Sequence, residues 1–309
     1  MKEFQSELPA KEISILESLQ NQLQLAKKLE KVYENRPNPR AFVGSMQGTK
    51  YEKDYTLDMV KKDEQYVEEK RAKIEEKNNS KSQTDINYAE QGFQLSEILQ
   101  AMIVDRMNKN WFKDCKAIMT TDFDDLRVGI DAVMKHEKGG YLGASFDFTV
   151  SNQDKIIYEK LNNHWKNNVI DGKIPTVKYF EDPDTKQKGK LIVPKFIIGA
   201  SKKDVEELAN AYLADNKTVL DNHPLKYLML LQIEEQLQTV LDYYETTDTK
   251  SFEFAKTQYE RIQTLLRSMK NEIHLDEKMH EVDLHEYSKQ SIALDMIKRF
   301  RIMRDRKPK

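Results

Sequence analysis

The stretch DFDDLRVGIDAVMKHEKGGYLGASFDFTV, residues 122–150, decides the fold predicted for this chain. In its first half, apolar residues alternate with polar residues or glycine from Leu126 to Ile130. The same alternation resumes after a turn at Gly139-Gly140. A period of two is typical of a strand with two unlike faces, and a Gly-Gly pair is a turn signal. The stretch therefore predicts a β-hairpin that folds about Gly139.

This hairpin would bring two acidic residues together. Folding about Gly139 places Asp131 opposite Asp147, on the polar face of the two strands. Carboxylates that face each other repel, so the pairing is costly unless a cation lies between them. A divalent metal ion would serve, and the alternative is that both are ordinary solvated side chains on an exposed face.

Length and composition set the outer limits. With 309 residues the chain can form one large domain or two ordinary ones, and 33% charged residues predict a heavily charged surface. The net charge of −2 gives no general attraction to nucleic acid, so binding of DNA would need a local basic groove. The single cysteine, Cys115, excludes an intramolecular disulfide and fits a reducing compartment, where we interpret it as a buried thiol.

No part of the sequence predicts a membrane protein. No apolar run approaches the roughly 20 residues that cross a bilayer. The N-terminal residues MKEFQSELPAKE lack the apolar core of a signal peptide. We therefore expect a cytoplasmic protein with no membrane partner.

The pattern of apolar residues divides the chain into three regions. Residues 1–84 are predicted to form a helical extension that ends in the polar linker KNNSKSQT, 77–84. Residues 85–215 form the α/β core, and residues 216–309 form a C-terminal helical region with long apolar stripes. These stripes either pack in the protein's own core or bury a helix of a partner protein or of a second copy.

Within the core region the elements follow in the order helix, three strands, helix, strand. A short strand at 116–120 precedes the hairpin, and a helix begins near Asp154. The apolar run LIVPKFIIGAS, 191–201, predicts one strand buried on both faces, with its first half restricted by Pro194. The expected fold class is α+β, with helices layered on a small mixed sheet.

These features carry a resemblance. The succession αβββαβ, with an acid on the first helix and two acids on the hairpin, resembles the restriction-endonuclease-like core of the PD-(D/E)XK nuclease superfamily. The resemblance covers roughly residues 85–200. By this resemblance Glu97 corresponds to the acid of the first helix, Asp131 to the first motif aspartate and Asp147 to the second acid.

The sequence departs from the family pattern at the motif lysine. That position, two residues after the second acid, is Thr149. In some members of the superfamily the lysine comes from another element, and the candidates here are Lys135, Lys155 and Lys160. If none of these amines reaches the acids, the domain would bind without cleaving.

The resemblance implies an enzyme that hydrolyses phosphodiesters of nucleic acid with Mg²⁺ or Mn²⁺ as cofactor. Glu97, Asp131 and Asp147 would be metal ligands, because hard divalent cations prefer oxygen. Lys155 or Lys160 would stabilise the developing anion. DNA is favoured over RNA as the partner. The alternative function is a non-catalytic interaction or nucleic-acid-binding protein on the same or a helical scaffold.

Two further clusters, one of aspartates and one of histidines, are candidate metal sites. Asp122, Asp124 and Asp125 are close enough in sequence to the hairpin to join its acids, although such a run is more typical of a turn. His274, His280 and His285 are spaced by six and five residues, which does not place them on one face of a helix. We therefore expect no metal site at the histidines.

Overall fold

The computed structural model describes residues 10–79, 83–136, 143–150, 154–182, 184–247 and 252–273. Within these ranges the side chains of residues 10–20, 22, 77–79, 83–94 and 154–157 also lie outside the description. The predicted Gly-Gly turn, the three C-terminal histidines and the last of the C-terminal apolar stripes, within residues 284–303, fall outside the described residues.

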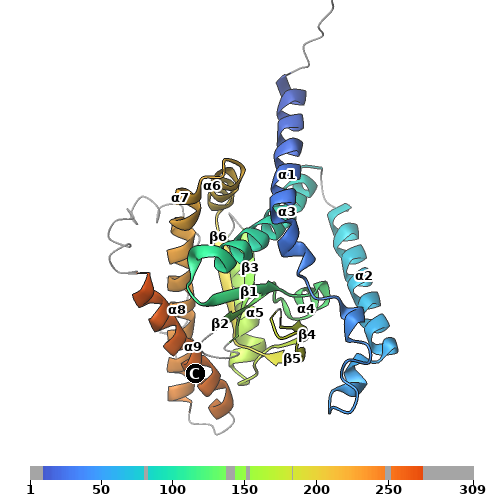
Figure 1. The fold of residues 1–309 in the computed structure, drawn as a ribbon, viewed down its shortest axis with the longest axis vertical. Helices are drawn as coiled ribbons and strands as arrows, with labels where there is room; N and C mark the ends of the chain where they lie inside the picture. The colour runs from blue at the N-terminus through green and yellow to red at the C-terminus, as the bar shows by residue number, and fades with distance from the viewer. Residues whose placement is uncertain are drawn as a thin grey trace, which may run out of the picture.

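The described chain forms a mixed sheet surrounded by helices (Figure 1). The α-helices are α1 (Ala10–Glu34), α2 (Leu57–Asn79), α3 (Gln83–Arg106), α4 (Asp122–Val128), α5 (Asp154–His164), α6 (Lys202–Leu213), α7 (Lys217–Asp221), α8 (Pro224–Thr246) and α9 (Glu253–Glu272). The strands are β1 (Cys115–Met119), β2 (Ala132–His136), β3 (Ala144–Val150), β4 (Thr176–Glu181), β5 (Lys188–Ile192) and β6 (Lys195–Ala200). Short 3-10 turns η1 (Pro39–Phe42) and η2 (Glu52–Tyr55) and π-helical turns η3 (Met107–Trp111) and η4 (Trp165–Val169) complete the order.

The main sheet has four strands in the order β1-β2-β3-β6. β2 is antiparallel to both β1 and β3, whereas β6 runs parallel to β3 because α5 crosses over between them. In the hairpin, Ala132 pairs with Phe146 and Val133 with Ser145, so the predicted register is confirmed. The predicted α+β class, with helices packed on a small mixed sheet, is confirmed as well.

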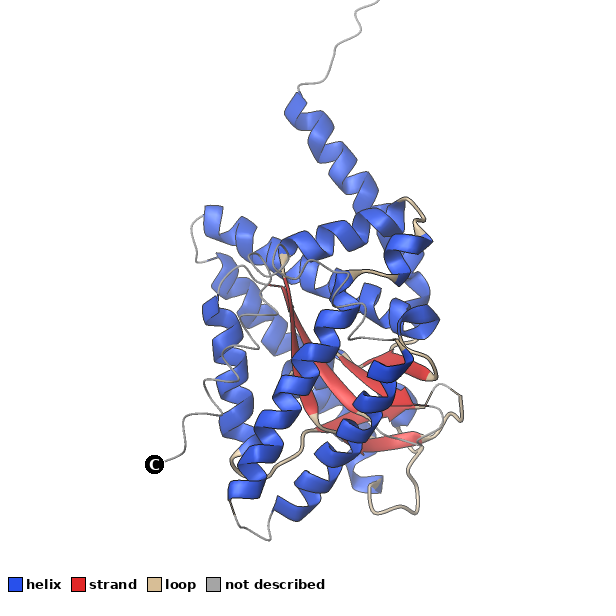
Figure 2. Cartoon of the chain, turned by 90° about the vertical axis from the view of Figure 1, so that its left-hand side faces the viewer, coloured by secondary structure: helices blue, strands red, loops and turns tan. Residues whose placement is uncertain are grey.

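The sheet separates two unlike faces, and helices enclose it (Figure 2). On the first face, apolar side chains such as Phe146, Phe148 and Phe196 join one large core with α1, α3, α8 and α9. This core takes residues from all three regions of the sequence. On the second face, Val133 packs against the small β4-β5 hairpin, while Asp147 and Lys195 point to the same side.

One prediction for the opening stretch is wrong. Residues 122–128 form helix α4 and not the beginning of a strand. Thr121 caps this helix by accepting a hydrogen bond from the N–H of Asp124, and Gly129 ends it at φ +64°, where a side chain is unfavourable. β2 begins only at Ala132, because the chain must first turn through Gly129.

The prediction of a single strand at 191–201 is also wrong. Pro194 separates two strands that belong to different sheets, β5 in the small hairpin and β6 in the main sheet. A proline donates no backbone hydrogen bond and so interrupts a ladder. Ser201, which directly follows β6, caps α6 in a reciprocal pair with Asp204.

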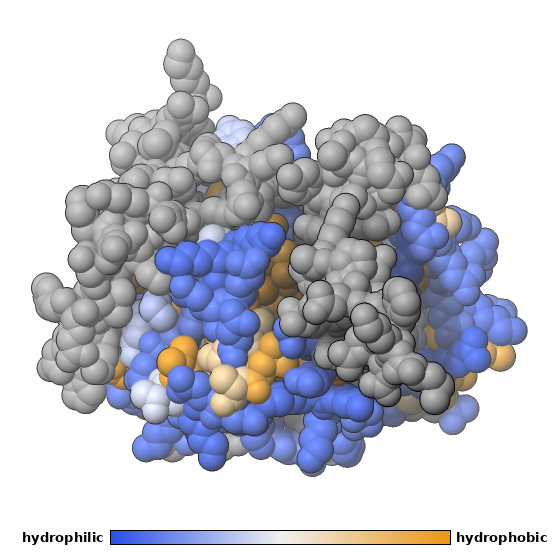
Figure 3. All heavy atoms as spheres, turned by 90° about the horizontal axis from the view of Figure 1, so that it is seen from above, coloured by the Kyte–Doolittle hydropathy of each residue, from blue (hydrophilic) through white to orange (hydrophobic). Residues whose placement is uncertain are grey.

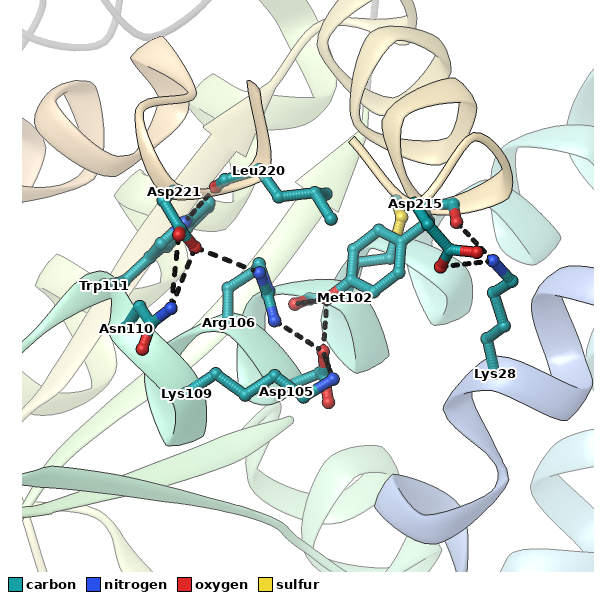
Figure 4. Close-up of polar contacts among 11 residues, drawn as sticks. Lys28, Met102, Asp105, Arg106, Lys109, Asn110, Trp111, Asp215, Leu220 and Asp221 are labelled. Carbon is teal, nitrogen blue, oxygen red and sulfur yellow. Dashed lines mark hydrogen bonds and ion pairs between the residues drawn. The ribbon is translucent and has the colours of Figure 1, made fainter. Parts of the chain in front are cut away.

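A buried polar network joins α3 to the helices that follow the sheet (Figure 4). The Asp105 carboxylate accepts hydrogen bonds from the Tyr212 hydroxyl at 2.6 Å and from Lys109 at 2.8 Å. Arg106 donates to Asp221 at 3.2 Å. Trp111 donates its indole N–H to a backbone carbonyl of α7 at 2.8 Å. The network fixes α6 and α7 against α3.

Side-chain amides complete the hydrogen bonds of both outer strands of the main sheet. On β6, Gln236 accepts from the N–H of Ile197 and donates to its carbonyl, both at 2.9 Å. Gln232, one helical turn away on α8, makes the same pair of bonds with Gly199. On β1, Asn108 pairs in the same way with Ala117.

The surface agrees with the charged composition. Seen from above, the described atoms are mostly hydrophilic, with a small hydrophobic area near the centre of that face (Figure 3). Among the described helices, none combines the length and the apolar character that a membrane span requires.

Replacement of Gln236 by leucine tests the amide pairs. We expect Gln236→Leu to lower the free energy of unfolding by about 2 to 4 kcal/mol, because the buried N–H and C=O of Ile197 both lose their partner. Urea denaturation would measure the loss. The control is Gln238→Leu, an exposed position on the same helix, where a change below about 0.5 kcal/mol is expected. Equal effects in the two variants would contradict this account.

Candidate active site

Asp131 and Asp147 lie on the second face of the sheet, at the point where β2 begins. Extending the β2-β3 register by one residue places them opposite each other. They are not solvated, since only 4% of Asp131 and 6% of Asp147 are exposed. One oxygen of Asp131 accepts a hydrogen bond from the N–H of Phe148 at 2.6 Å. The hairpin therefore places two carboxyl groups in the protein interior.

Helix α4 adds a third carboxyl group, that of Asp125, which shares a hydrogen bond with Asp131. The other two acids of this run are engaged elsewhere. Asp122 pairs with Arg36 and Arg71. Asp124 accepts hydrogen bonds from backbone N–H groups of β4. Of the three acids in this run, Asp125 alone joins the hairpin pair.

Two lysines bind the two oxygens of Asp147. Lys160, on α5, donates to Oδ1 at 2.6 Å. Lys195, at the start of β6, donates to Oδ2 at 3.3 Å and to the carbonyls of Val128 and Gly129 at 3.1 Å each. The acids and amines thus come from α4, the start of β2, β3, α5 and β6.

The site has a marked electrostatic imbalance. Burial, followed by the negative charges of Asp125 and Asp147, holds the pKa of Asp131 well above its usual range. Burial lowers the pKa of Lys160, but Asp147, Asp131 and Asp125 together raise it more, so it is charged. Burial raises the pKa of Asp125 as well. Three carboxyl groups therefore face the two amines of Lys160 and Lys195, and ionisation of all three acids would leave one negative charge without a counter-charge.

A histidine lies next to this cluster. His164 follows Lys160 by one helical turn on α5, and its buried Nδ1 has no hydrogen-bond partner among the described residues. Burial and the charge of Lys195 lower the pKa of His164 to about 3. The imidazole is therefore neutral in the folded protein at physiological pH.

The structure does not bring all predicted residues to this site. Glu97 lies on α3, which packs on the opposite face of the sheet, and among the described residues no hydrogen bond or ion pair joins it to either aspartate. Lys135 binds Asp182 at 2.8 Å, on the strand side that faces the small hairpin. The side chain of Lys155 lies outside the described part of the chain. Asp131, Asp147 and Lys160 are in one cluster.

The site offers the type of ligand atom, carboxylate oxygen, that a hard divalent cation prefers. Three carboxyl groups provide oxygen ligands, and a cation would supply the counter-charge that ionised Asp131 requires. Among the described residues, no group of three or more acid, histidine or cysteine side chains is already arranged to hold a metal ion. Asp131 would have to release its proton, and Asp147 would have to release an ammonium group. The carboxyl groups therefore fit a divalent cation if that cation replaces the proton of Asp131 and one ammonium group on Asp147.

Two members of the cluster, Lys195 and His164, were not predicted. Lys195 stands alone among the apolar residues of β6, and a single cation in a strand buried on both faces is a signal of an inward-facing charge. His164 carries no such signal, because one histidine in an amphipathic helix is common.

The raised pKa of Asp131 predicts a pH-dependent stability. The folded state binds this proton more tightly than the unfolded state, so stability falls as pH rises from about 4 through the folded pKa. Asp131→Asn mimics the protonated form. In metal-free buffer we expect the variant to be more stable than the wild type at pH 8, and the difference to shrink towards pH 4.

Urea unfolding across this pH range measures the difference. The control is Asp171→Asn, which removes an exposed carboxylate paired with Lys173 and should show no such trend. A stability difference that does not vary with pH would mean that Asp131 is ionised in the folded protein.

The chain was compared with models of protein families, with curated proteins and with solved structures, and none of the three comparisons gave a match. What this site does is therefore inferred from its own side chains and their geometry.

Proposed function

We propose that this protein is a metal-dependent nuclease, in which Asp125, Asp131 and Asp147 bind Mg²⁺ or Mn²⁺ and Lys160 assists hydrolysis of a phosphodiester. The observation that carries the proposal is the buried carboxyl cluster with an amine on Asp147. Buried acids with strongly perturbed pKa values beside a specific charged partner are typical of functional sites. A purely structural cluster of this kind would be costly to fold.

The arrangement of elements supports the same proposal. α3 precedes the antiparallel strands β1, β2 and β3, and α5 leads to β6, which is parallel to β3. This succession supports the proposal of a restriction-endonuclease-like core. The chain adds α4 before β2 and the β4-β5 hairpin before β6. Asp125 of the added helix contributes the third carboxyl group in place of Glu97.

The residues of the site have separable tasks in this proposal. A bound divalent cation lowers the pKa of a water and stabilises negative charge on the phosphoryl group. Asp131 and Asp147 hold the cation at a fixed place because both are anchored in the sheet. Lys160 takes the task of the motif lysine, whose position is occupied here by Thr149, and offers a positive charge to the developing anion.

A binding protein without catalysis is the second candidate. It is favoured by one observation, namely that both oxygens of Asp147 are already bound to ammonium groups. In such a protein the lysines would permanently replace the cation, and the same scaffold would bind nucleic acid or a protein without cleaving it. Metal binding and cleavage assays separate the two candidates.

Cleavage of nucleic acid in the presence of Mn²⁺ tests the proposal. Plasmid DNA, single-stranded DNA and RNA would be offered with Mn²⁺, with Mg²⁺ and with chelator, and DNA is the expected substrate. We expect Asp131→Asn and Lys160→Met each to lower the cleavage rate by about 10²-fold or more, the scale for loss of one preorganised charge. Calorimetry should show Mn²⁺ binding to the wild type and its loss in Asp131→Asn.

Matched variants guard against a general effect. Asp171→Asn and Lys166→Met remove exposed groups of the same kinds and should retain full activity and Mn²⁺ binding. Absence of both Mn²⁺ binding and cleavage in the wild type would overturn the proposal in favour of the binding protein.

A further inference from the structure

The two lysines on Asp147 are held very differently. The ammonium group of Lys195 has three donors and three oxygen acceptors, namely Asp147 and the carbonyls of Val128 and Gly129. Only 10% of its side chain is exposed. Its hydrogen-bonding capacity is therefore satisfied, and removing it from its place would leave three oxygens, one of them on the buried Asp147, with fewer partners.

The surroundings of Lys195 are also tightly packed. A Cβ atom placed at Gly129 would lie 3.1 Å from Lys195 Nζ and 3.2 Å from Asp147 Oδ2, closer than most real contacts of this kind. Gly129 ends α4, so the hydrogen bonds from Lys195 to Val128, Gly129 and Asp147 tie the end of α4 to β3 and β6. β6 is itself held on its outer side by Gln232 and Gln236. Lys195 is thus held by the end of α4 and by β3, on a strand, β6, that α8 fixes from its outer side.

Among the residues whose side chains the structure describes, Lys160 has one acceptor. It donates one hydrogen bond, to Asp147 Oδ1, and 36% of its side chain is exposed. A lysine side chain has four flexible methylene groups, and its charged end can be solvated when it leaves a carboxylate. Release of Lys160 therefore leaves one oxygen that must find another hydrogen-bond donor or a cation, whereas release of Lys195 leaves three such oxygens.

We infer that the two amines have separate roles: Lys195 is a positioning residue that stays on Asp147, and Lys160 is the displaceable group that leaves Asp147 Oδ1 when a divalent cation binds. This inference rests on the proposed function. The cation takes the oxygen that Lys160 gives up, and the released amine remains beside it on α5. Lys160 is then free to approach the phosphoryl group, while Lys195 keeps Asp147 in the orientation that the cation requires.

Amine labelling of the wild-type full-length protein tests this separation. The protein is treated briefly with an acetylating reagent, with and without saturating Mn²⁺, and each lysine is quantified by peptide mass spectrometry. We expect the labelled fraction of Lys160 to rise when Mn²⁺ is added, because its amine leaves the carboxylate. Lys195 should remain protected in both conditions. Lys166, an exposed lysine six residues after Lys160, serves as the reference and should not change.

The Asp131→Asn variant provides the matched control, in which Mn²⁺ should no longer alter labelling of Lys160. Calorimetry on the same samples reports Mn²⁺ binding independently. If Mn²⁺ binds but Lys160 labelling stays constant, or Lys195 becomes labelled, the inference is wrong while the proposed nuclease function is untouched. If no Mn²⁺ binds, the metal site itself fails, and the inference fails with it.

Discussion

The carboxyl group of Asp131 is buried beside two other acids, and much of the local structure compensates for that placement. The raised pKa of Asp131 and the two lysines on Asp147 offset the negative charge of the cluster, and a backbone N–H from β3 is hydrogen-bonded to Asp131. Charged groups pay a large desolvation cost in a protein interior unless they are paired. Folding of this region therefore depends on bringing α5 and β6 to the hairpin, because those elements carry the two amines.

This constraint explains how the short helix α4 relates to the sheet. Thr121 caps the beginning of the helix and Gly129 ends it. Lys195 donates hydrogen bonds to the carbonyl groups of Val128 and Gly129 at that end. The helix in turn presents Asp125 to Asp131. The ammonium group of Lys195 thus links the end of α4 to Asp147 in the middle of β3. The chemistry proposed for the site uses the same groups that stabilise it, so exchange of a proton and an ammonium group for a metal ion would alter function and stability together.

Much of the main sheet could be predicted from the sequence, because period-two alternation and a Gly-Gly turn specify strands and their register. The pairing that brings Asp131 opposite Asp147 followed from this alone. The short helix α4 was missed because Leu126, Val128 and Ile130 also satisfy strand alternation. Its true signals were the cap at Thr121 with Asp124 three residues later and the glycine at its end.

Contacts between distant segments were harder to predict. Lys195 reaches Asp147 only because β6 lies parallel to β3, and no local pattern in the sequence reveals that register. Lys160 could be proposed because it lies on the helix after the hairpin, although its neighbour Lys155 was an equal candidate. Glu97 was carried over from a resemblance, and α3 places it on the other side of the sheet from the cluster.

The amides that cover Ile197, Gly199 and Ala117 have a consequence for assembly. Exposed backbone groups on an outer strand are templates for the docking of a foreign β-strand, which is a common route to aggregation. Here the amide of a glutamine or asparagine imitates that foreign peptide from within the chain. At these positions neither a second copy nor an extended peptide ligand can lengthen the sheet without first displacing a side-chain amide, and those of Gln232 and Gln236 on β6 are buried.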